Sequence, residues 1–84
     1  MSQITVQEST LKEILASVFN VDAGSISDAT SADNLVQWDS LQHLNLVLTL
    51  EESLGIRLSD DHTLMMTSMS AIKKILGEYG FVVD

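Results

Sequence analysis

The residues best suited to chemistry are the neighbours Asp39 and Ser40, which stand where a helix is expected to begin. Backbone N–H groups at a helix start lack partners within the helix and carry the positive end of its dipole. A phosphate ester on the Ser40 hydroxyl would be stabilised there, and the Asp39 carboxylate could help to bind Mg²⁺ beside it. Both residues are also common helix caps, and the local sequence alone favours capping.

His43 suggests a second chemistry, in which Ser40 is the nucleophile of a hydrolase. A catalytic triad needs the histidine to bridge the serine and the carboxylate, with an oxyanion hole alongside. Here the three groups crowd one helical turn, and a chain of 84 residues leaves little room for a deep cleft. We therefore predict no catalytic residue. His43 is interpreted as a packing partner for Trp38, and the alternative for Trp38 is an exposed contact with a partner.

Asp60, Asp61 and His62 form the other group with metal-ligand chemistry. An EF-hand calcium loop needs ligands at alternating positions and a central glycine, and this segment has neither. The chain has no cysteine, which excludes disulfides, iron–sulfur clusters and zinc–thiolate sites. We predict no metal site and assign these residues to helix capping and surface charge.

Length and charge limit the classes of partner. With 84 residues, the chain is expected to form one domain over residues 1–84. It has 12 acidic and 4 basic side chains, a net charge of −8, which argues against nucleic acid and anionic membranes as partners. Its apolar runs are too short to span a bilayer, and MSQITVQEST lacks the pattern of a signal peptide. We expect a cytoplasmic monomer.

The negative charge is concentrated in the middle of the chain. Nearly all of the net charge lies between Val21 and Asp61, on both sides of Ser40. Such a run is usually a solvated face that keeps a small domain soluble. It would also create a field that steers basic partners towards this stretch.

Hydrophobic periodicity predicts the elements that position these residues. Apolar residues at helical spacing indicate a first helix over residues 5–19. Residues 20–39 have no clean period and predict a long loop, which is uncommon in a compact domain unless it has a function. Three apolar side chains are expected to hold this loop to the core, namely Val21, Ile26 and Leu35.

A second helix is expected to begin at Asp39 and Ser40 and to end at Gly55 as a left-handed cap. Asp39 and Gln42 have the spacing of a reciprocal capping box. Apolar positions cover more of this helix than one core-facing stripe needs. Four of them are assigned to the core, namely Leu46, Val47, Leu50 and Leu54. Leu41 and Leu48 are expected on the exposed flank.

Two further helices complete the expected fold. Ser59 or Asp60 caps a short third helix that ends at Leu64. A fourth helix is capped by Thr67 or Ser68 and stops at Gly80. The methionine-rich run that joins them is assigned to the core: Leu64, Met65, Met66 and Met69. The fold class is all-α, a small bundle of three main helices and one short helix with a long first loop, and the one strand-like run is the tail, Phe81–Val83.

The run Trp38–Leu44, WDSLQHL, followed by Leu50–Leu58, LEESLGIRL, resembles the acyl carrier protein family. More narrowly, it is similar to stand-alone bacterial carriers with a W-D-S-L core. The likeness extends over residues 11–76, and the combination of D-S-L with L-E-E-x-x-G-I is specific. It implies a carrier, not an enzyme.

The resemblance also implies a cofactor. Ser40 would carry 4′-phosphopantetheine, which a separate phosphopantetheinyl transferase adds from coenzyme A with Mg²⁺, and Asp39 would support the modification. The cofactor thiol would hold an acyl or aminoacyl group as a thioester, which fits a chain without cysteine. A pocket for that group is expected between the second helix and the methionine-rich run, with Leu50, Leu54 and Ile56.

The resemblance further implies partners. Glu51 and Glu52 would contact basic patches on acyl-loading and acyl-processing enzymes, and Leu41 and Leu48 would make apolar contacts beside the serine. Fatty-acid, polyketide, amino-acid and surface-polymer systems all use this scaffold.

The sequence departs from the fatty-acid carriers at three positions. Gln42 and Asn45 are neutral where those proteins usually carry acids, and Trp38 replaces a small residue. These departures favour a dedicated pathway with its own partner enzymes. The alternative from another class is an unmodified acidic helical adaptor that only binds proteins.

Overall fold

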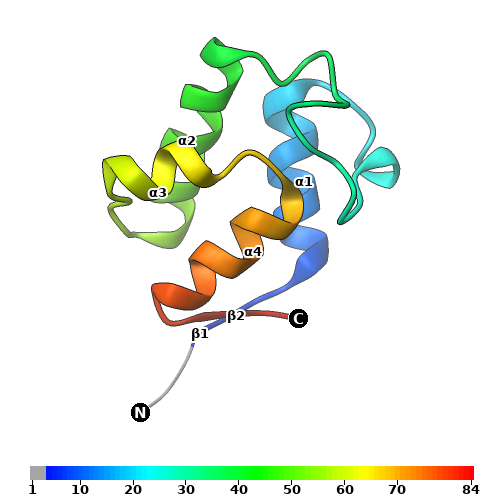
Figure 1. Cartoon of the computed structure of the whole chain (residues 1–84). Helices are drawn as coiled ribbons and strands as arrows, with labels where there is room; N and C mark the ends of the chain where they lie inside the picture. The colour runs from blue at the N-terminus through cyan, green and yellow to red at the C-terminus, as the bar shows by residue number, and fades with distance from the viewer. Residues whose placement is uncertain (1–3) are drawn as a thin grey trace.

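A computed structural model describes residues 4–84 of the chain (Figure 1). Four helices lie in this range: α1 (Glu8–Phe19), α2 (Ser40–Leu54), α3 (Asp60–Met65) and α4 (Met69–Glu78). A 3₁₀ turn and two short strands complete it: η1 (Ala23–Ser25), β1 (Ile4–Val6) and β2 (Phe81–Val83). The predicted bundle of three main helices and one short helix is confirmed, and no helix within the described range is long and apolar enough to cross a membrane.

The first helix begins later than predicted, because Ile4–Val6 forms a strand. β1 pairs in parallel with β2, the tail that the sequence marked as strand-like, and Figure 1 shows the two side by side beneath the helices. Glu8 N–H donates to the carbonyl of Asp84 over 2.7 Å, and Asp84 N–H donates to Val6 over 2.9 Å. A helical start near residue 5 was wrong because β-branched residues take a strand conformation when a partner strand is present.

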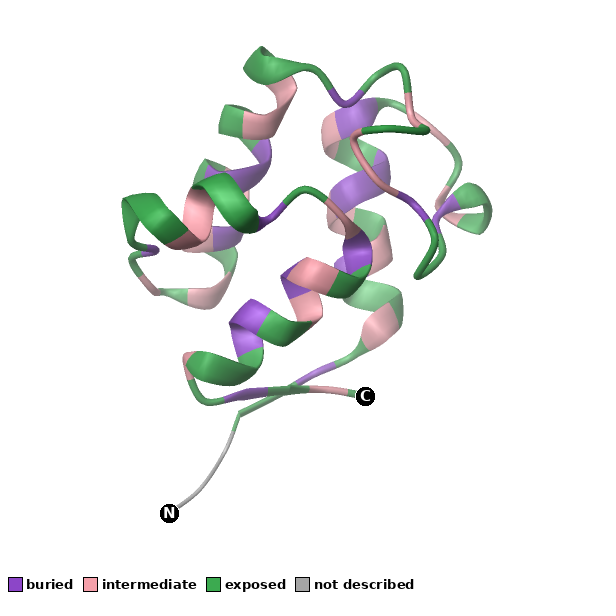
Figure 2. Ribbon diagram, viewed as in Figure 1, coloured by how far each residue is buried: buried purple, intermediate pink, exposed green. Residues whose placement is uncertain are grey.

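One hydrophobic core joins three of the helices, and Figure 2 shows buried segments along their inner faces. The fully buried helical side chains are Leu11, Leu15, Phe19, Leu46, Leu50, Met69, Ile72 and Leu76. Leu54, assigned to the core, is only partly buried, although it packs against the core.

The methionine-rich run is divided between core and surface. Met66 and Met69 are fully buried, as predicted, but Leu64 and Met65 are 74% and 61% exposed, so their assignment to the core was wrong. The reason is that α3 is too short to have a buried stripe of its own. It is anchored instead by Leu58 and Met66, which lie just outside its two ends.

The loop over residues 20–39 is held in place by both apolar and backbone contacts. Ile26 is buried, and Val21 and Leu35 pack against the core, as predicted. The loop also pairs with the segment before α4, where two 2.9 Å backbone hydrogen bonds join Met69 N–H to Thr30 O and Ala32 N–H to Thr67 O. The loop therefore reaches the start of α2 along a defined path.

Lys73 ties α4 to both α1 and this loop. Its ammonium lies 2.6 Å from Glu8 and 2.5 Å from Asp28. The hydrogen bonds that Lys73 donates to Asp28 and then to Glu8 raise the pKa of Lys73. The hydrogen bond that Glu8 accepts from Lys73, followed by the one from Lys12, lowers the pKa of Glu8. The two carboxylates of Glu8 and Asp28 are therefore the ion-pair partners of Lys73.

A second tie joins the start of α2 to α3 through a buried indole. Trp38 is 5% exposed and packs on Phe19 of α1, with ring centroids 4.7 Å apart. Its Nε1–H donates to Nδ1 of His43 over 3.0 Å, and the two rings stack, which confirms the predicted packing. Nε2 of His43 lies 2.8 Å from the carbonyl oxygen of Thr63. We call these three residues the Trp38–His43–Thr63 chain.

The Trp38–His43–Thr63 chain determines the tautomer of His43. A carbonyl oxygen can only accept, so Nε2 carries the proton, and Nδ1 accepts from the indole. The imidazole that satisfies both bonds is therefore neutral. Thr63 lies in the last turn of α3, where its carbonyl oxygen accepts a 3.4 Å hydrogen bond from Met66 N–H. The bond from His43 is the shorter of the two that this oxygen accepts.

We expect Lys73→Met to lower the melting temperature at neutral pH. Glu8, whose pKa is lowered from 4.5 on folding, contributes stability above that value and loses it as the pH falls through its folded pKa. Lys73, whose pKa is raised from 10.5, loses its contribution as the pH rises through its folded pKa. In thermal melts from about pH 8 to about pH 3, the melting temperatures of the wild type and Lys73→Met should converge in acid. Lys74→Met is the exposed control, and a difference that persists in acid would contradict the pairing.

We expect His43→Ala to lower the free energy of unfolding by about 1–3 kcal/mol, because Trp38 is left with a buried N–H that has no acceptor. Urea denaturation measures the change. Asn45→Ala, an exposed position on the same helix, is the matched control and should change stability by less than about 0.5 kcal/mol. Equal effects of the two substitutions would show that the Trp38–His43–Thr63 chain adds no stability.

Candidate functional site

Ser40 is the first residue of α2, and its side chain is exposed. Asp39 is the N-cap, as predicted, and its Oδ1 accepts from Gln42 N–H over 2.9 Å. The carbonyl of Asp39 accepts from His43 N–H over 2.8 Å. The N–H groups of Ser40 and Leu41, which have no preceding helical turn to bond, are thus left at the positive end of a 15-residue helix.

The reciprocal capping box predicted for Gln42 does not form. Its Oε1 accepts from Nδ2 of Asn45 over 2.9 Å instead of reaching back to the N–H of Asp39. The two amide side chains lie one turn apart on the helix and bond each other, which competes with the longer reach to the cap. They place an uncharged polar pair on α2, close to Ser40.

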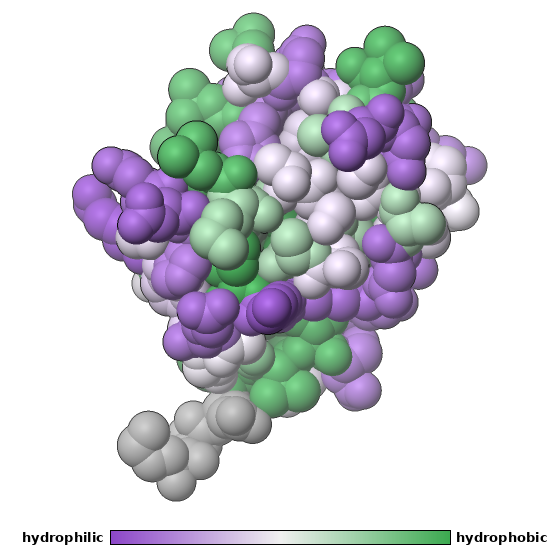
Figure 3. Space-filling view, viewed as in Figure 1, coloured by the Kyte–Doolittle hydropathy of each residue, from purple (hydrophilic) through white to green (hydrophobic). Residues whose placement is uncertain are grey.

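Exposed apolar side chains surround this start of α2. Leu41 and Leu48 are 67% and 51% exposed, as predicted, and Leu44 between them is 53% exposed. Figure 3 shows hydrophobic side chains gathered over the upper part of α2 and the end of α3, where Leu64 and Met65 are also exposed. Leu44 was not among the side chains predicted to be exposed, although residues 41, 44 and 48 have the spacing of one helical stripe. We call these five residues the apolar patch.

A surface pocket of about 540 Å³ opens between the start of α2 and the end of α3. Its lining residues come from α2, α3 and the segments on either side: Ala32, Trp38, Asp39, Ser40, His43, Leu44, Thr63, Leu64 and Thr67. The sequence placed a cargo pocket deeper, at Leu50, Leu54 and Ile56. Leu50 is instead fully buried in the core, and none of these residues lines the pocket beside Ser40.

His43 cannot serve as a base for Ser40 in this arrangement. Its Nδ1 accepts from Trp38 and its Nε2 donates to Thr63, so both ring nitrogens are occupied. The Ser40 hydrolase is therefore not supported. Trp38 itself is buried, so the alternative in which it is an exposed partner contact is corrected: it lines the pocket and supports His43.

Two of the acidic residues that were predicted to meet partners have different environments. Glu51 is partly buried, and its Oε2 accepts from Leu58 N–H over 2.8 Å, which fixes the turn between α2 and α3. Glu52 is exposed. A charge reversal at Glu51 would therefore also disturb the fold, whereas Glu52 is accessible to a partner.

The candidate metal residues are spread over different contacts. Ser59 caps α3 by accepting from His62 N–H, and the His62 ring lies 2.7 Å from the Tyr79 hydroxyl and 3.2 Å from Glu78 Oε1. Asp60 and Asp61 occupy the first turn of α3, where carboxylates favour the helix dipole. Within residues 4–84, no three potential ligands from His, Cys, Asp and Glu come together as a metal site.

Comparison with known proteins gives one type of match. No protein-family model and no curated protein matches the chain. Among solved structures, the chain is similar to the holo acyl carrier protein from Geobacter metallireducens, determined by NMR in solution. The TM-score is 0.71 and the sequence identity 26%, and the alignment covers 81% of this chain and 78% of that chain. The chain therefore has an acyl-carrier-protein-like fold, as the sequence resemblance implied.

Proposed function

We propose that the chain is a carrier protein in which Ser40 bears a 4′-phosphopantetheine arm. The observation that carries this proposal is an exposed serine at the first position of α2, beside a pocket, in a fold similar to that of a holo acyl carrier protein. The arm supplies a thiol that holds an acyl or aminoacyl group as a thioester. The chain presents that group to partner enzymes and raises its effective concentration at each of them.

The residues around Ser40 fit a phosphate ester. The N–H groups of Ser40 and Leu41, together with the helix dipole, favour negative charge at the Ser40 oxygen. Asp39 caps the helix with Oδ1, and a carboxylate has further acceptor sites with which it can bind Mg²⁺ during the modification. A separate phosphopantetheinyl transferase performs this step with coenzyme A, so the chain needs no catalytic residue of its own.

We assign the carrier to a dedicated pathway, as a stand-alone protein of the W-D-S-L type that acts as a monomer in the cytoplasm. The neutral pair Gln42 and Asn45 adds no charge to α2 near Ser40, and the apolar patch adjoins it. Enzymes that load and process the acyl group would therefore meet apolar contacts near Ser40. Further along α2, a basic patch on the same enzymes would contact Glu52. Glu51 would contribute less to this contact.

An unmodified adaptor would use the same apolar patch without the serine. The two functions differ in what Ser40 does: a carrier requires its hydroxyl, whereas an adaptor functions equally well with alanine at this position. The helix capping by Asp39 does not distinguish them, because it serves the fold in either case.

We expect the full chain to gain the mass of one phosphopantetheine when it is incubated with coenzyme A, Mg²⁺ and a broad-specificity phosphopantetheinyl transferase. The reason is that Ser40 is exposed at the helix start. Intact-mass spectrometry measures the gain, and Ser40→Ala should abolish it while leaving the circular dichroism spectrum unchanged. The proposal is refuted by no gain in the wild type, or by an equal gain in Ser40→Ala, and the former outcome would favour the adaptor.

We expect Glu52→Lys to raise the KM of that transferase for the chain by about two- to fivefold at low salt, because an exposed charge at a docking surface acts through its pairing with a basic partner. Glu13→Lys, an exposed position on α1, is the charge-matched control. The difference should shrink in high salt. If the two variants have the same KM at low salt, Glu52 does not belong to the docking surface.

A further inference from the structure

The pocket beside Ser40 is bounded on its inner side by the Trp38–His43–Thr63 chain. We propose that the Trp38–His43–Thr63 chain closes the seam between α2 and α3. The group carried on Ser40 therefore stays in the surface pocket and is a short acyl or aminoacyl group. The inference rests on the proposed function, and it names the class of cargo and the residues that limit its length.

The position of His43 explains why the seam is closed. It projects from the first turns of α2 and bonds the carbonyl of Thr63 on α3 over 2.8 Å, so it spans the gap between the two helices. Trp38 stacks on it and is itself packed on Phe19, which prevents the imidazole from turning aside. Trp38, His43 and Thr63 all line the pocket.

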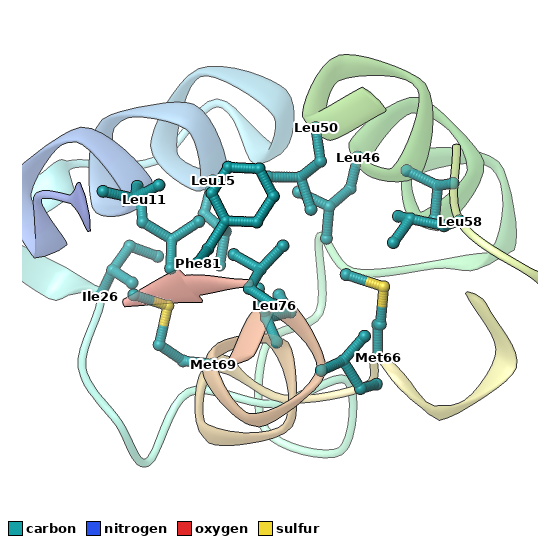
Figure 4. Close-up of a cluster of buried hydrophobic side chains, with 14 of the residues drawn as sticks. Leu11, Leu15, Ile26, Leu46, Leu50, Leu58, Met66, Met69, Leu76 and Phe81 are labelled. Carbon is teal, nitrogen blue, oxygen red and sulfur yellow. The ribbon is translucent and has the colours of Figure 1, made fainter. Parts of the chain in front are cut away.

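The core beneath the Trp38–His43–Thr63 chain has no space for a long acyl group. Leu46, Leu50 and Met66 are each 0% exposed, and none of them lines the pocket. Figure 4 shows Leu46 from α2 and Met66 from the segment after α3 reaching into the same region of the core. Protein interiors are packed as densely as organic crystals, so a long chain would have to displace these side chains.

Entry of the cargo into the core would also break both hydrogen bonds of the Trp38–His43–Thr63 chain. The indole N–H of Trp38 is buried and would lose its acceptor, Nδ1 of His43. The carbonyl oxygen of Thr63 would lose Nε2 of His43 as a donor. Buried polar groups without a partner are strongly disfavoured. Cargo in the pocket, which has a volume of about 540 Å³, leaves both bonds intact and lies among lining residues that include Ala32, Leu44 and Leu64.

The test compares two lengths of cargo on the full chain. The transferase is supplied with acetyl-coenzyme A or octanoyl-coenzyme A, and complete modification is verified by intact mass. The readouts are the methyl NMR signals of leucine, alanine and methionine and the melting temperature. The acetyl and octanoyl forms should both shift the signals of Ala32 and Leu44 and leave those of Leu46 and Met66 in place. The two forms should also have the same melting temperature. An octanoyl form that moves the core signals and melts higher than the acetyl form overturns the inference.

His43→Ala tests the closing residue itself. In this variant the octanoyl form should shift the Leu46 and Met66 signals relative to the acetyl form of the same variant, a comparison that cancels any general loss of stability. His62→Ala, which removes the other histidine at its contacts with Tyr79 and Glu78, is the control and should behave as the wild type. A folded His43→Ala protein with no response to cargo length also overturns the inference.

Failure of the inference is distinguishable from failure of the proposed function. No mass gain from any coenzyme A derivative refutes the carrier and, with it, the inference. Normal loading accompanied by core shifts in the wild type refutes the closed seam alone. If His43→Ala does not fold, the comparison of acetyl and octanoyl forms in the wild type still decides the question.

Discussion

Burial of Trp38 against Phe19 removes its indole N–H from water, and a buried donor requires an acceptor within the protein. His43 is that acceptor, and its second nitrogen then donates to Thr63 at the end of α3. A contact between two aromatic rings therefore determines the tautomer of His43 and one wall of the pocket beside Ser40. It also links α3, which has no buried residue of its own, to α2.

The acidic charge is used in two ways. Several acids in the middle of the chain bond groups of the fold itself, namely Asp28, Asp39 and Glu51. Glu52, Asp60 and Asp61 lie on the exposed surface, where their charge faces solvent. The start of α2 is surrounded by the apolar patch and a neutral amide pair. Apart from Asp39, which caps α2 next to Ser40, the negative charge of the chain is therefore better described as a field at a distance from the site than as a ring of charge around Ser40.

Features that depend on neighbouring residues were predicted well. The cap at Asp39, the left-handed Gly55 and the cap at Ser68 each involve residues within about one helical turn. One error is local, because Gln42 bonds Asn45 one turn away instead of completing the capping box. The other errors concern residues whose environment is set by distant segments. Ile4–Val6 is a strand because the tail lies beside it, and Met65 is exposed because α3 is anchored by residues outside its ends.

Periodicity and capping chemistry within single elements were sufficient to predict the all-α class, the position of Ser40 at a helix start and the exposure of Leu41 and Leu48. The location of the pocket and the two hydrogen bonds of the His43 ring depend on contacts between distant segments. The same is true of the hydrogen bond that Glu51 accepts in the turn before α3 and of the ion pair between Lys73 and Asp28 in the long loop. Each of these results depends on which distant donor and acceptor come within hydrogen-bond distance, and that distance is set by packing rather than by spacing along the chain.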